Sequence, residues 1–511
     1  MRIATETPAA VTDLVRRTEA RRQACSAALD PKLRARLGQY FTPSPTADFI
    51  ASLADMAEAD TVRILDPGAG VGSLSASLVA RLLTERPGVK ISVTACEVDP
   101  QLHPTLEATL DDCVNTANSL NSHVEVKLVP GNFISWAAEG ESLLAEPPEP
   151  FDVVIMNPPY KKLAARSHER KLVASVCTET SNLYSAFMAL GVRLLRPGGQ
   201  LPAITPRSFA NGPYFRLFCQ YFLERMHIDR VHLFEARNKV FADAAVLQEN
   251  VIFAATRTND TERGPVVVST SKSYSDEVRQ RSVPYTEVVH PDDPEFFIHI
   301  SADEGDTQLA AVHARLPATL HDLRLQVSTG RVVDFRSKEH LRPEHIDGAV
   351  PLIYPLHMHD GVIIWPVSGA KKNNAIILNE ETRKLTFPSG YYVVVKRLSS
   401  KEEKRRVVAA VFDPVDIPCD RIGFENHVNV FHIDGSGLPE TMARGLCIWL
   451  NSTLLDRFIR RLNGHTQINA TDLRNLRYPS IEQITAMGHA WKSGTWFSQE
   501  EIDELVSRQV G

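Results

Sequence analysis

The chain has 511 residues, of which 43% are hydrophobic and 23% are charged, and its formal net charge at pH 7 is −6. This length is enough for two or three domains that each bury a core, and the composition excludes a disordered chain. No stretch approaches the roughly 20 apolar residues of a membrane span. The N-terminus also lacks the apolar region of a secretory signal.

The seven cysteines are widely spaced and include no Cys-x-x-Cys pair. This pattern argues against a disulfide framework and against a zinc cluster. We therefore expect a protein of the reducing cytoplasm of a bacterium or archaeon, without a metal site and without a membrane partner.

The first part of the chain is predicted to be helical. Residues 10–36 form a segment rich in arginine and alanine, which we interpret as an N-terminal helical arm over residues 1–36. A second helix is expected to begin at Ser44 and Pro45, because proline fits the first helical turn. Its apolar residues Phe49, Ile50 and Leu53 share one face.

From residue 61 to about 258, apolar strands alternate with helices. The predicted strands are residues 62–66, 91–96, 124–129, 151–156, 200–205, 231–234 and 250–256. This alternation is typical of a doubly wound α/β sheet, in which ligand-binding loops follow the carboxyl ends of the strands. A helix over residues 182–195 is expected to pack on this sheet.

A glycine-rich turn, Asp-Pro-Gly-Ala-Gly-Val-Gly, follows the first strand. Gly68, Gly70 and Gly72 remove side chains where the backbone must approach a ligand. The turn lacks the last spacing of the dinucleotide pattern, and Asp66 would repel a pyrophosphate but attract a cationic amino-acid moiety. S-adenosylmethionine carries such an ammonium group. Glu97, at the tip of the next strand, is placed to hold the ribose hydroxyls.

The sequence Asn157-Pro158-Pro159-Tyr160 ends the apolar run 151–156. Two prolines stiffen the backbone and carry no N–H, so their carbonyls are available as acceptors. The Asn157 side-chain oxygen and the Pro158 carbonyl can each accept a hydrogen bond from an exocyclic NH2 group, and Tyr160 supplies a ring on which a base can stack. These residues are also ordinary turn formers, but together with the glycine turn they indicate a site for a nucleobase.

With these motifs the chain resembles the N6-adenine DNA methyltransferases of the gamma arrangement, in which a target-recognition domain follows a Rossmann-like class I catalytic domain. Residues 38–43 are similar to the first cofactor motif, which includes Tyr40 and Thr42. Residues 66–72 are similar to the second cofactor motif. Glu97 and Val98 are similar to the residues that contact the cofactor ribose. Residues 157–160 are similar to the catalytic motif.

Further positions extend this resemblance. Asn132 and Phe133 stand where the family contacts the cofactor adenine, although the usual residue there is acidic rather than asparagine. The amide oxygen of Asn132 can still accept a bond from the adenine amino group. Residues 194–206 are similar to the turn and strand after the catalytic segment, and Phe241 to the aromatic residue that packs against the flipped adenine.

The closing segment, residues 463–479, is similar to that of modification methylases of the PstI and BsuBI systems. This likeness implies CTGCAG as the target, methylated on its adenine. The resemblance as a whole implies S-adenosylmethionine as cofactor and double-stranded DNA as substrate. Because N6 cannot reach such a pocket while the base is stacked, the adenine must flip out of the duplex. Any partner restriction endonuclease would be a separate chain, and we expect a monomer.

The net negative charge opposes DNA binding, since phosphate contacts supply most nonspecific affinity. The distribution of charge favours it. Lys161 and Lys162 directly follow the catalytic motif, a second basic run covers residues 396–406, and three arginines within residues 457–461 have helical spacing. A run of this kind is often a solvated face, above all residues 401–406, which include two glutamates.

We place the catalytic domain at residues 37–260, because residues 258–264 form a polar break. Residues 261–511 are then a connecting segment and a mixed α/β target-recognition domain. Arg331, His465 and Gln467 lie in turns of this part, and their residue types suit the reading of guanine and adenine edges.

Other substrates fit the same motif. A methyltransferase acting on RNA or on a protein glutamine amide also needs a pocket for a planar NH2 group, and cytosine N4 would fit chemically. A glutamine-modifying enzyme needs no recognition domain of roughly 200 residues, whereas a reader of several base pairs does. A third class is a sensor that keeps the fold without turnover, and a fused nuclease is a fourth possibility. The intact motifs argue against the sensor, and the lack of a convincing Asp…Glu-x-Lys site argues against the nuclease.

Overall fold

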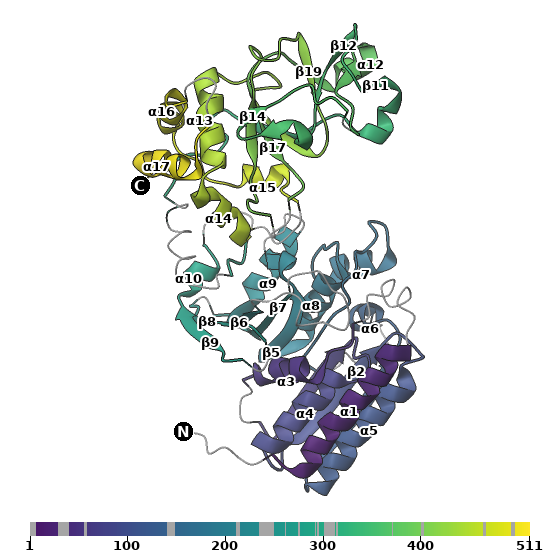
Figure 1. Cartoon of the computed structure of the whole chain (residues 1–511). Helices are drawn as coiled ribbons and strands as arrows, with labels where there is room; N and C mark the ends of the chain where they lie inside the picture. Colours follow the sequence, from purple (N-terminus) through teal and green to yellow (C-terminus); the bar gives the residue numbers. More distant parts are fainter. Residues whose placement is uncertain are drawn as a thin grey trace. The chain divides into compact units, whose positions relative to one another are not determined.

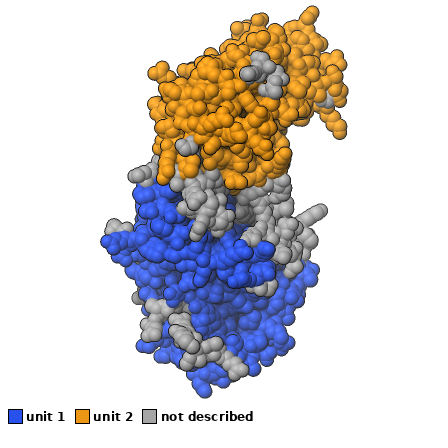
Figure 2. Space-filling model, turned by 60° about the vertical axis from the view of Figure 1, so that its left-hand side comes forward, with its two compact units in different colours: residues 1–302 blue, residues 303–511 orange. Residues whose placement is uncertain are grey.

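The computed structural model describes the chain except for residues 1–6, 29–39, 56–58, 140–148, 211–214, 235–249, 261, 274–275, 292, 294–295, 301–311, 313–314, 370, 400–402, 463–466, 492–495 and 511. It divides into two compact units, Met1–Ala302 and Asp303–Gly511 (Figure 1, Figure 2).

One nine-stranded sheet organises the first unit, in the order β3-β2-β1-β4-β5-β7-β6-β8-β9. Strands β1 to β5 pair in parallel, whereas β7 runs antiparallel between β5 and β6. All seven predicted strands are present, and the α/β fold class is confirmed. The bounds are β1 Thr61–Pro67, β2 Lys90–Glu97, β3 His123–Pro130, β4 Phe151–Val154, β5 Leu195–Pro206, β6 Met226–Phe234, β7 Asn250–Arg257, β8 Val266–Ser271 and β9 Arg279–Val283.

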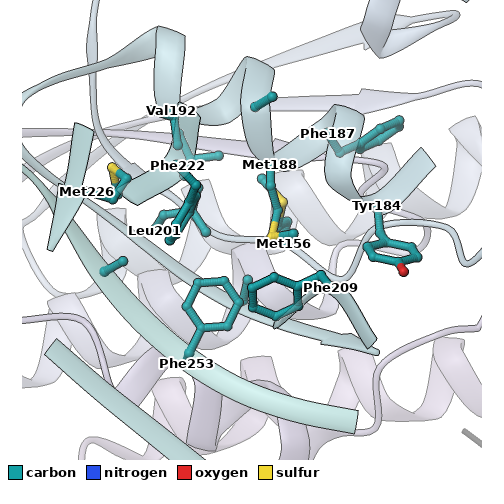
Figure 3. Close-up of a cluster of buried hydrophobic side chains, with 14 of the residues drawn as sticks. Met156, Tyr184, Phe187, Met188, Val192, Leu201, Phe209, Phe222, Met226 and Phe253 are labelled. Carbon is teal, nitrogen blue, oxygen red and sulfur yellow. The ribbon is translucent and has the colours of Figure 1, made fainter. Parts of the chain in front are cut away.

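Helices cover both faces of this sheet, because successive strand residues point to opposite sides. In β1, Ile64 packs with one helix layer and Leu65 with the other. The first layer holds α1 (Ala9–Ala28), α3 (Ser44–Ser52), α4 (Ser73–Glu85) and α5 (His103–Ser119). The second holds α6 (Phe133–Glu139), α7 (His168–Val176), α8 (Leu183–Leu194), α9 (Arg216–Arg225) and α10 (Tyr285–Val288). Figure 3 shows part of the second core, with Met188 of α8 against Met156 and Phe222 against Leu201.

The N-terminal helix packs into the core of the first unit, in agreement with an arm that lies over this unit. Val11 and Leu14 of α1 are buried in the cluster that includes α4 and α5. Arg17 and Arg21 both bind Asp112 of α5.

The first unit also extends beyond the boundary expected at residue 260. Strand β8 pairs in parallel with β6, and β9 pairs with β8, so both belong to the same nine-stranded sheet. Val266 and Val268 bury their side chains in the same core as α8. The polar break near residue 260 is a loop between strands of one sheet, and the unit ends at Ala302.

The second unit has two sheets, one of six strands in the order β10-β20-β17-β18-β14-β13 and one of five in the order β11-β15-β12-β19-β16. Helices α13 (Glu440–Leu450) and α16 (Ile481–His489) pack so closely that a Cβ on Gly445 would meet the Ile484 carbonyl oxygen. The strands are β10 Gln326–Thr329, β11 Leu341–Arg342, β12 Ala349–Ile353, β13 Met358–His359, β14 Val362–Ile363, β15 Ala375–Ile377, β16 Thr386–Pro388, β17 Tyr392–Lys396, β18 Ala409–Phe412, β19 Arg421–Phe424 and β20 Val428–His432. The helices are α12 Glu380–Arg383, α13 Glu440–Leu450, α14 Thr453–Leu462, α15 Ala470–Arg474, α16 Ile481–His489 and α17 Gln499–Val510.

Within the described residues, none of the helices combines the length and the apolar character needed to cross a membrane.

Candidate active site

A cavity of about 390 Å³ lies in the first unit, at the carboxyl ends of parallel strands β1, β2, β3 and β4. Its volume falls within the roughly 300–1,000 Å³ of small-molecule sites, and its position is the one at which open α/β sheets bind ligands. The predicted site residues that line it are Tyr40, Gly68, Gly70, Glu97, Val98, Asn132, Phe133, Asn157, Pro159, Lys161 and Lys162.

Other lining residues had no assigned role in the sequence. Phe41 lies inside the first cofactor motif, so its neighbours Tyr40 and Thr42 were a signal for it. Phe187 occupies one position in the apolar run of α8, where nothing separates a lining residue from a core residue. The remaining ones are Cys96, Leu102, Gly131, Leu163, Ala164, Ser167, Glu169 and Leu183.

The glycine turn folds over the end of β2. The backbone N–H groups of Gly68 and Ala69 both donate to the Cys96 carbonyl at 2.9 Å. Gly70 has a φ of +59°, and a Cβ there would meet the Phe41 ring at 3.1 Å. Glycine is therefore required at this position both by the backbone conformation and by close packing beside the cavity.

Glu97 joins the glycine turn to the tip of β2. One carboxylate oxygen accepts from the Gly70 N–H at 2.8 Å, and the other accepts from the Asp99 N–H at 2.8 Å. Burial raises the pKa of Glu97, while these two donors favour its charged form. Each carboxylate oxygen can accept more than one bond, so Glu97 can hold the turn and still bind hydroxyl groups in the cavity.

Asp66 and Gly72 are the two predicted site residues of the turn that do not line the cavity. One oxygen of Asp66 accepts from the backbone N–H and the hydroxyl of Ser75, at 3.2 and 2.7 Å. Its other oxygen is buried and has no hydrogen-bond partner among the described residues. Burial raises the pKa of Asp66 to about 7.

Gly72 serves helix packing rather than the approach of a ligand. It precedes α4 with a φ of +83°, and a Cβ there would meet Leu106 and Thr109 of α5 at 3.0 and 3.1 Å. The spacing of the three glycines suggested one common purpose, but the third faces the neighbouring helix.

Asn132 and Phe133 line the cavity at the start of α6. The side-chain oxygen of Asn132 accepts from the Ile134 N–H at 2.9 Å, so this oxygen also satisfies the first turn of the helix. The ring of Phe133 lies 4.8 Å from that of Phe187, measured between centroids. These two rings give the cavity an apolar wall.

The Asn157 side chain has a defined orientation. Its Nδ2 donates to the Tyr40 carbonyl and to Oγ1 of Thr42, both at 3.1 Å. These two bonds use both amide hydrogens and fix the assignment of oxygen and nitrogen. Among the described residues no donor reaches the amide oxygen, which is therefore the acceptor that this side chain offers.

Thr42 was expected to bind the cofactor, but the structure places it elsewhere. Its side chain is buried and does not line the cavity. Its described role is to accept the hydrogen bond from Asn157. Thr42 thus acts through Asn157, a link between residues far apart in the sequence that no local motif encodes.

The two prolines differ in their surroundings. The Pro159 carbonyl accepts from the Lys161 N–H at 3.1 Å, which closes the turn after the motif. Pro158 is buried, and within the described part of the chain no N–H group donates to its carbonyl. Unlike Pro159, Pro158 does not line the cavity. That its carbonyl accepts a hydrogen bond from the target amine stays a prediction.

Tyr160 is half-buried and packs against the core of the first unit. Its ring centroid lies 6.3 Å from that of Tyr40 and 6.3 Å from that of Tyr184. Tyr40 lines the cavity, whereas Tyr160 does not. The stacking role expected for Tyr160 thus stays a prediction.

Lys161 and Lys162 are exposed and lie at the rim of the cavity. Their segment is held against the start of α8, because Lys162 pairs with Asn182 and the Leu183 N–H donates to the Lys161 carbonyl at 2.8 Å. The two ammonium groups are thus attached to a fixed segment of backbone next to residues 157–160.

The predicted base-reading residues lie in the second unit or outside the described residues. Arg331 is exposed, and its guanidinium lies 4.0 Å from the centroid of the Phe387 ring. Gln467 accepts from Nη2 of Arg397 at 3.4 Å. Phe241 and His465 fall outside the described residues.

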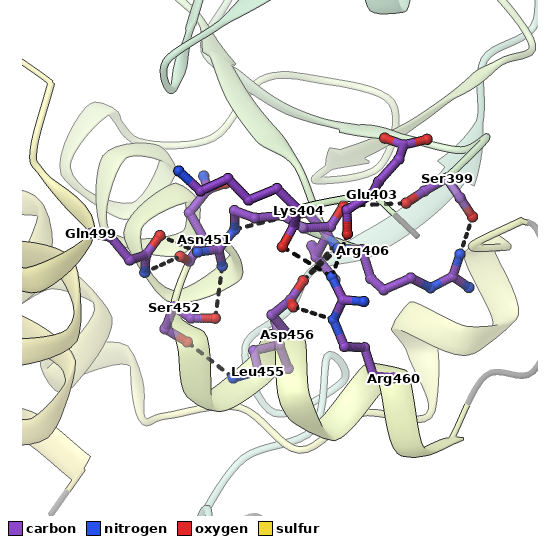
Figure 4. A network of polar contacts seen from close by, with 12 residues as sticks. Ser399, Glu403, Lys404, Arg406, Asn451, Ser452, Leu455, Asp456, Arg460 and Gln499 are labelled. Carbon is purple, nitrogen blue, oxygen red and sulfur yellow. Dashed lines mark hydrogen bonds and ion pairs between the residues drawn. The ribbon is translucent and has the colours of Figure 1, made fainter. Parts of the chain in front are cut away.

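The basic run 396–406 has a structural role (Figure 4). Lys396 pairs with Glu403 at 2.8 Å. The buried Arg406 donates its backbone N–H to Asp456 of α14 at 2.6 Å, and Arg460 binds the other oxygen of that carboxylate at 2.7 Å. Arg460 also donates to the backbone carbonyls of Glu403 and Lys404. Among the described residues of the run, 403–406 are thus attached to α14, whereas Lys404 is exposed.

Comparisons with known proteins agree with the motifs. Residues 105–241 match the family described as Eco57I restriction-modification methylase. The chain is 42% identical over 509 residues to the Type II methyltransferase M.PstI of Providencia stuartii, covering 99% of each chain. It is 43% identical over 463 residues to the Type II methyltransferase M.BsuBI of Bacillus subtilis, covering 89% of this chain and 90% of the relative.

The fold also occurs in solved structures. The Type IIL restriction-modification enzyme MmeI in complex with DNA is similar with a TM-score of 0.53 at 10% identity, over 98% of this chain and 75% of that chain. At this identity the likeness shows the fold alone. The nearly full-length identity to M.PstI and M.BsuBI shows the family: the chain belongs to the Type II DNA methyltransferases of restriction-modification systems.

Proposed function

We propose that the protein transfers a methyl group from S-adenosylmethionine to N6 of adenine within a specific sequence of double-stranded DNA. The observation that carries this proposal is the orientation of Asn157, whose NH2 group donates to Tyr40 and Thr42. Its oxygen is thereby left as an acceptor beside the cavity. An acceptor in this place suits a substrate that presents an amine.

The residues of the cavity fit S-adenosylmethionine. Glu97 suits the ribose hydroxyls, and the rings of Phe133 and Phe187 suit the faces of an adenine. Asp66 lies directly behind the glycine turn with one buried oxygen that lacks a partner among the described residues. A cationic group beside Gly68 would stabilise its charged form. When bound, the cofactor supplies a methyl group activated by a positively charged sulfur.

The chain's own groups act on the nucleophile. The lone pair of adenine N6 is delocalised into the ring, and hydrogen bonds from its two hydrogens to Asn157 Oδ1 and to the Pro158 carbonyl favour a more localised pair. Held by Glu97 and the glycine turn, the cofactor would supply the methyl group for N6 and would keep the electron pair of the broken bond between sulfur and carbon. The nitrogen would give up one proton to solvent, which balances the transfer. Neither acceptor is a strong base, so the residues contribute mainly by positioning.

The adenine must leave the duplex to reach these acceptors, because its N6 atom is enclosed by base stacking and pairing. We propose Tyr160, and Phe241 outside the described residues, as the rings that replace the lost stacking. Lys161 and Lys162 stand at the rim of the cavity, where the phosphates that flank an extruded nucleotide would pass.

The second unit is the proposed target-recognition domain, with Arg331, His465 and Gln467 as base-reading residues and CTGCAG as the target. Gln467 lies beside Arg397, so an amide and a guanidinium stand next to each other. Arginine and glutamine are the residue types that pair with guanine and adenine edges. A monomer can methylate each strand of a palindrome in turn, and the restriction endonuclease of the system would be a separate chain.

A transfer assay with labelled S-adenosylmethionine tests the proposal. Duplex DNA, RNA and total protein are offered in parallel, and the modified DNA is sequenced at single-molecule resolution. We expect label in duplex DNA and N6-methyladenine at one sequence. Asn157→Ala should abolish transfer while cofactor binding, measured by calorimetry, persists. Label in RNA or protein alone, or methylation of cytosine N4, would contradict the proposal.

A further inference from the structure

The N-terminal helix reaches the segment that orients Asn157. Glu19 of α1 accepts two hydrogen bonds from Ser44, the first residue of α3: one from the backbone N–H at 3.1 Å and one from the hydroxyl at 3.0 Å. The N-terminal N–H groups of a helix lack partners within the helix. Here no side chain of the residue before α3 caps it, and α1 supplies the acceptor instead.

Glu19 is itself held in place. Arg22 binds both of its carboxylate oxygens at 2.8 to 3.1 Å, and Gln23 donates to one of them at 2.9 Å. Although burial alone would raise the pKa of Glu19, these bonds and the bond from Ser44 lower it. Glu19 is therefore a fixed, charged acceptor rather than a mobile surface carboxylate.

Ser44 is joined to the active site by a short and stiff piece of chain. Pro43 precedes it with a φ of −61°, and the ring of proline allows little change in that angle. Before Pro43 stands Thr42, whose Oγ1 accepts from Asn157, and two residues earlier Tyr40 supplies the other acceptor. A shift of Ser44 is transmitted to both acceptors because few rotatable bonds separate them.

We propose that Glu19 is a positioning residue for methyl transfer: it fixes the start of α3 and thereby holds the two acceptors that orient the Asn157 amide. This proposal rests on the proposed role of Asn157 as the acceptor for the target amine. It assigns a function to α1 that its sequence does not reveal, because the contact joins residues 25 positions apart on different helices.

The test compares variants of Glu19 with a control on the same helix. Glu19→Ala should lower kcat between about ten- and a hundredfold, since a small misplacement of a reacting group has effects of this size. The KM for DNA should stay unchanged, because Glu19 does not line the cavity and its described contacts include neither rim lysine. Glu19→Gln keeps an acceptor oxygen and should retain more activity than Glu19→Ala. Asp13→Ala removes an exposed carboxylate of α1 that pairs only with Arg16 among the described residues, and should match the wild type.

A double-mutant cycle separates positioning from a general loss of stability. Glu19→Ala and Thr42→Val both act through Asn157, so their combined effect on kcat should be smaller than the product of the single effects. Ser44→Ala, which removes one of the two bonds to Glu19, should give a smaller loss than Glu19→Ala. Independent effects in the cycle, or an unchanged kcat with a lowered melting temperature, would overturn the proposal.

The result is distinguishable from failure of the proposed function. If the wild type methylates RNA or protein but not DNA, the proposed DNA substrate is wrong, and the Glu19 variants are then assayed on the substrate that accepts the label. A dependence of kcat on Glu19 with that substrate still supports positioning through Asn157.

Discussion

The side-chain amide of Asn157 donates to Oγ1 of Thr42 at 3.1 Å, and the same nitrogen donates to the Tyr40 carbonyl. The Tyr40 carbonyl, which can only accept, together with the buried Thr42 hydroxyl thus determines which atom of the Asn157 amide remains an acceptor. Without such a partner the amide could rotate and present its NH2 group to the substrate amine, which would repel it.

This relationship predicts the behaviour of Thr42 variants. Thr42→Val keeps the shape of the side chain but removes the acceptor, so kcat should fall about tenfold or more while the affinity for S-adenosylmethionine changes little. Thr42→Ser keeps the hydroxyl and serves as the matched control, with activity near that of the wild type. Kinetics at saturating cofactor measure kcat of the two variants, and calorimetry measures their affinity for S-adenosylmethionine. Equal kcat values for the valine and serine variants would show that the hydroxyl does not orient Asn157.

Replacing Glu97 tests the ribose site. Glu97→Ala removes both the proposed acceptor for the hydroxyls and the bonds to Gly70 and Asp99. We expect the dissociation constant for S-adenosylmethionine, measured by calorimetry, to rise roughly 10- to 150-fold, as for loss of a hydrogen bond to a charged group. Glu125→Ala on β3 removes an exposed carboxylate away from the cavity and should leave binding unchanged. Unaltered affinity in Glu97→Ala would remove this residue from the cofactor site.

Asp66 predicts a pH dependence of stability. Burial raises its pKa to about 7, whereas an unfolded aspartate titrates near about 3.9. Between these values the native state binds a proton that the unfolded state does not, so this residue makes the free energy of unfolding fall as pH rises from about 4 to about 7 and level off above. In Asp66→Asn the free energy of unfolding should therefore fall less between about pH 4 and about pH 7. Urea unfolding of both proteins at several pH values measures the difference, and identical slopes would contradict the raised pKa.

The rim lysines predict a salt dependence. For each phosphate that a protein no longer neutralises, the slope of log binding constant against log salt falls in magnitude by about 0.9. The double change Lys161→Ala and Lys162→Ala should therefore lower the slope by roughly 2 in DNA-binding measurements. Lys90→Ala removes an exposed lysine at the amino end of β2, opposite the cavity, and should not alter the slope. An unchanged salt slope in the double variant would mean that neither lysine contacts a DNA phosphate.

The sequence by itself determined much of the first unit. Its seven predicted strands are present, because runs such as residues 62–66 and 151–156 are short, apolar and bounded by turn residues. The glycine turn and the motif at Asn157 occupy the carboxyl ends of β1 and β4, as the α/β pattern requires. The family was also predicted from these local motifs, and the comparison with M.PstI confirms it.

Only the tertiary structure determined the contacts and strand pairings between segments that are distant in the sequence. Thr42 and Asn157 are 115 residues apart, and Glu19 and Ser44 lie on different helices, so no local pattern announces either contact. The antiparallel course of β7, the addition of β8 and β9 to the sheet, and the burial of Arg406 against α14 follow from pairings between remote segments. Periodicity and turn chemistry specify an element and its loop, whereas the hydrogen-bond partner of a side chain is specified only once the elements have packed.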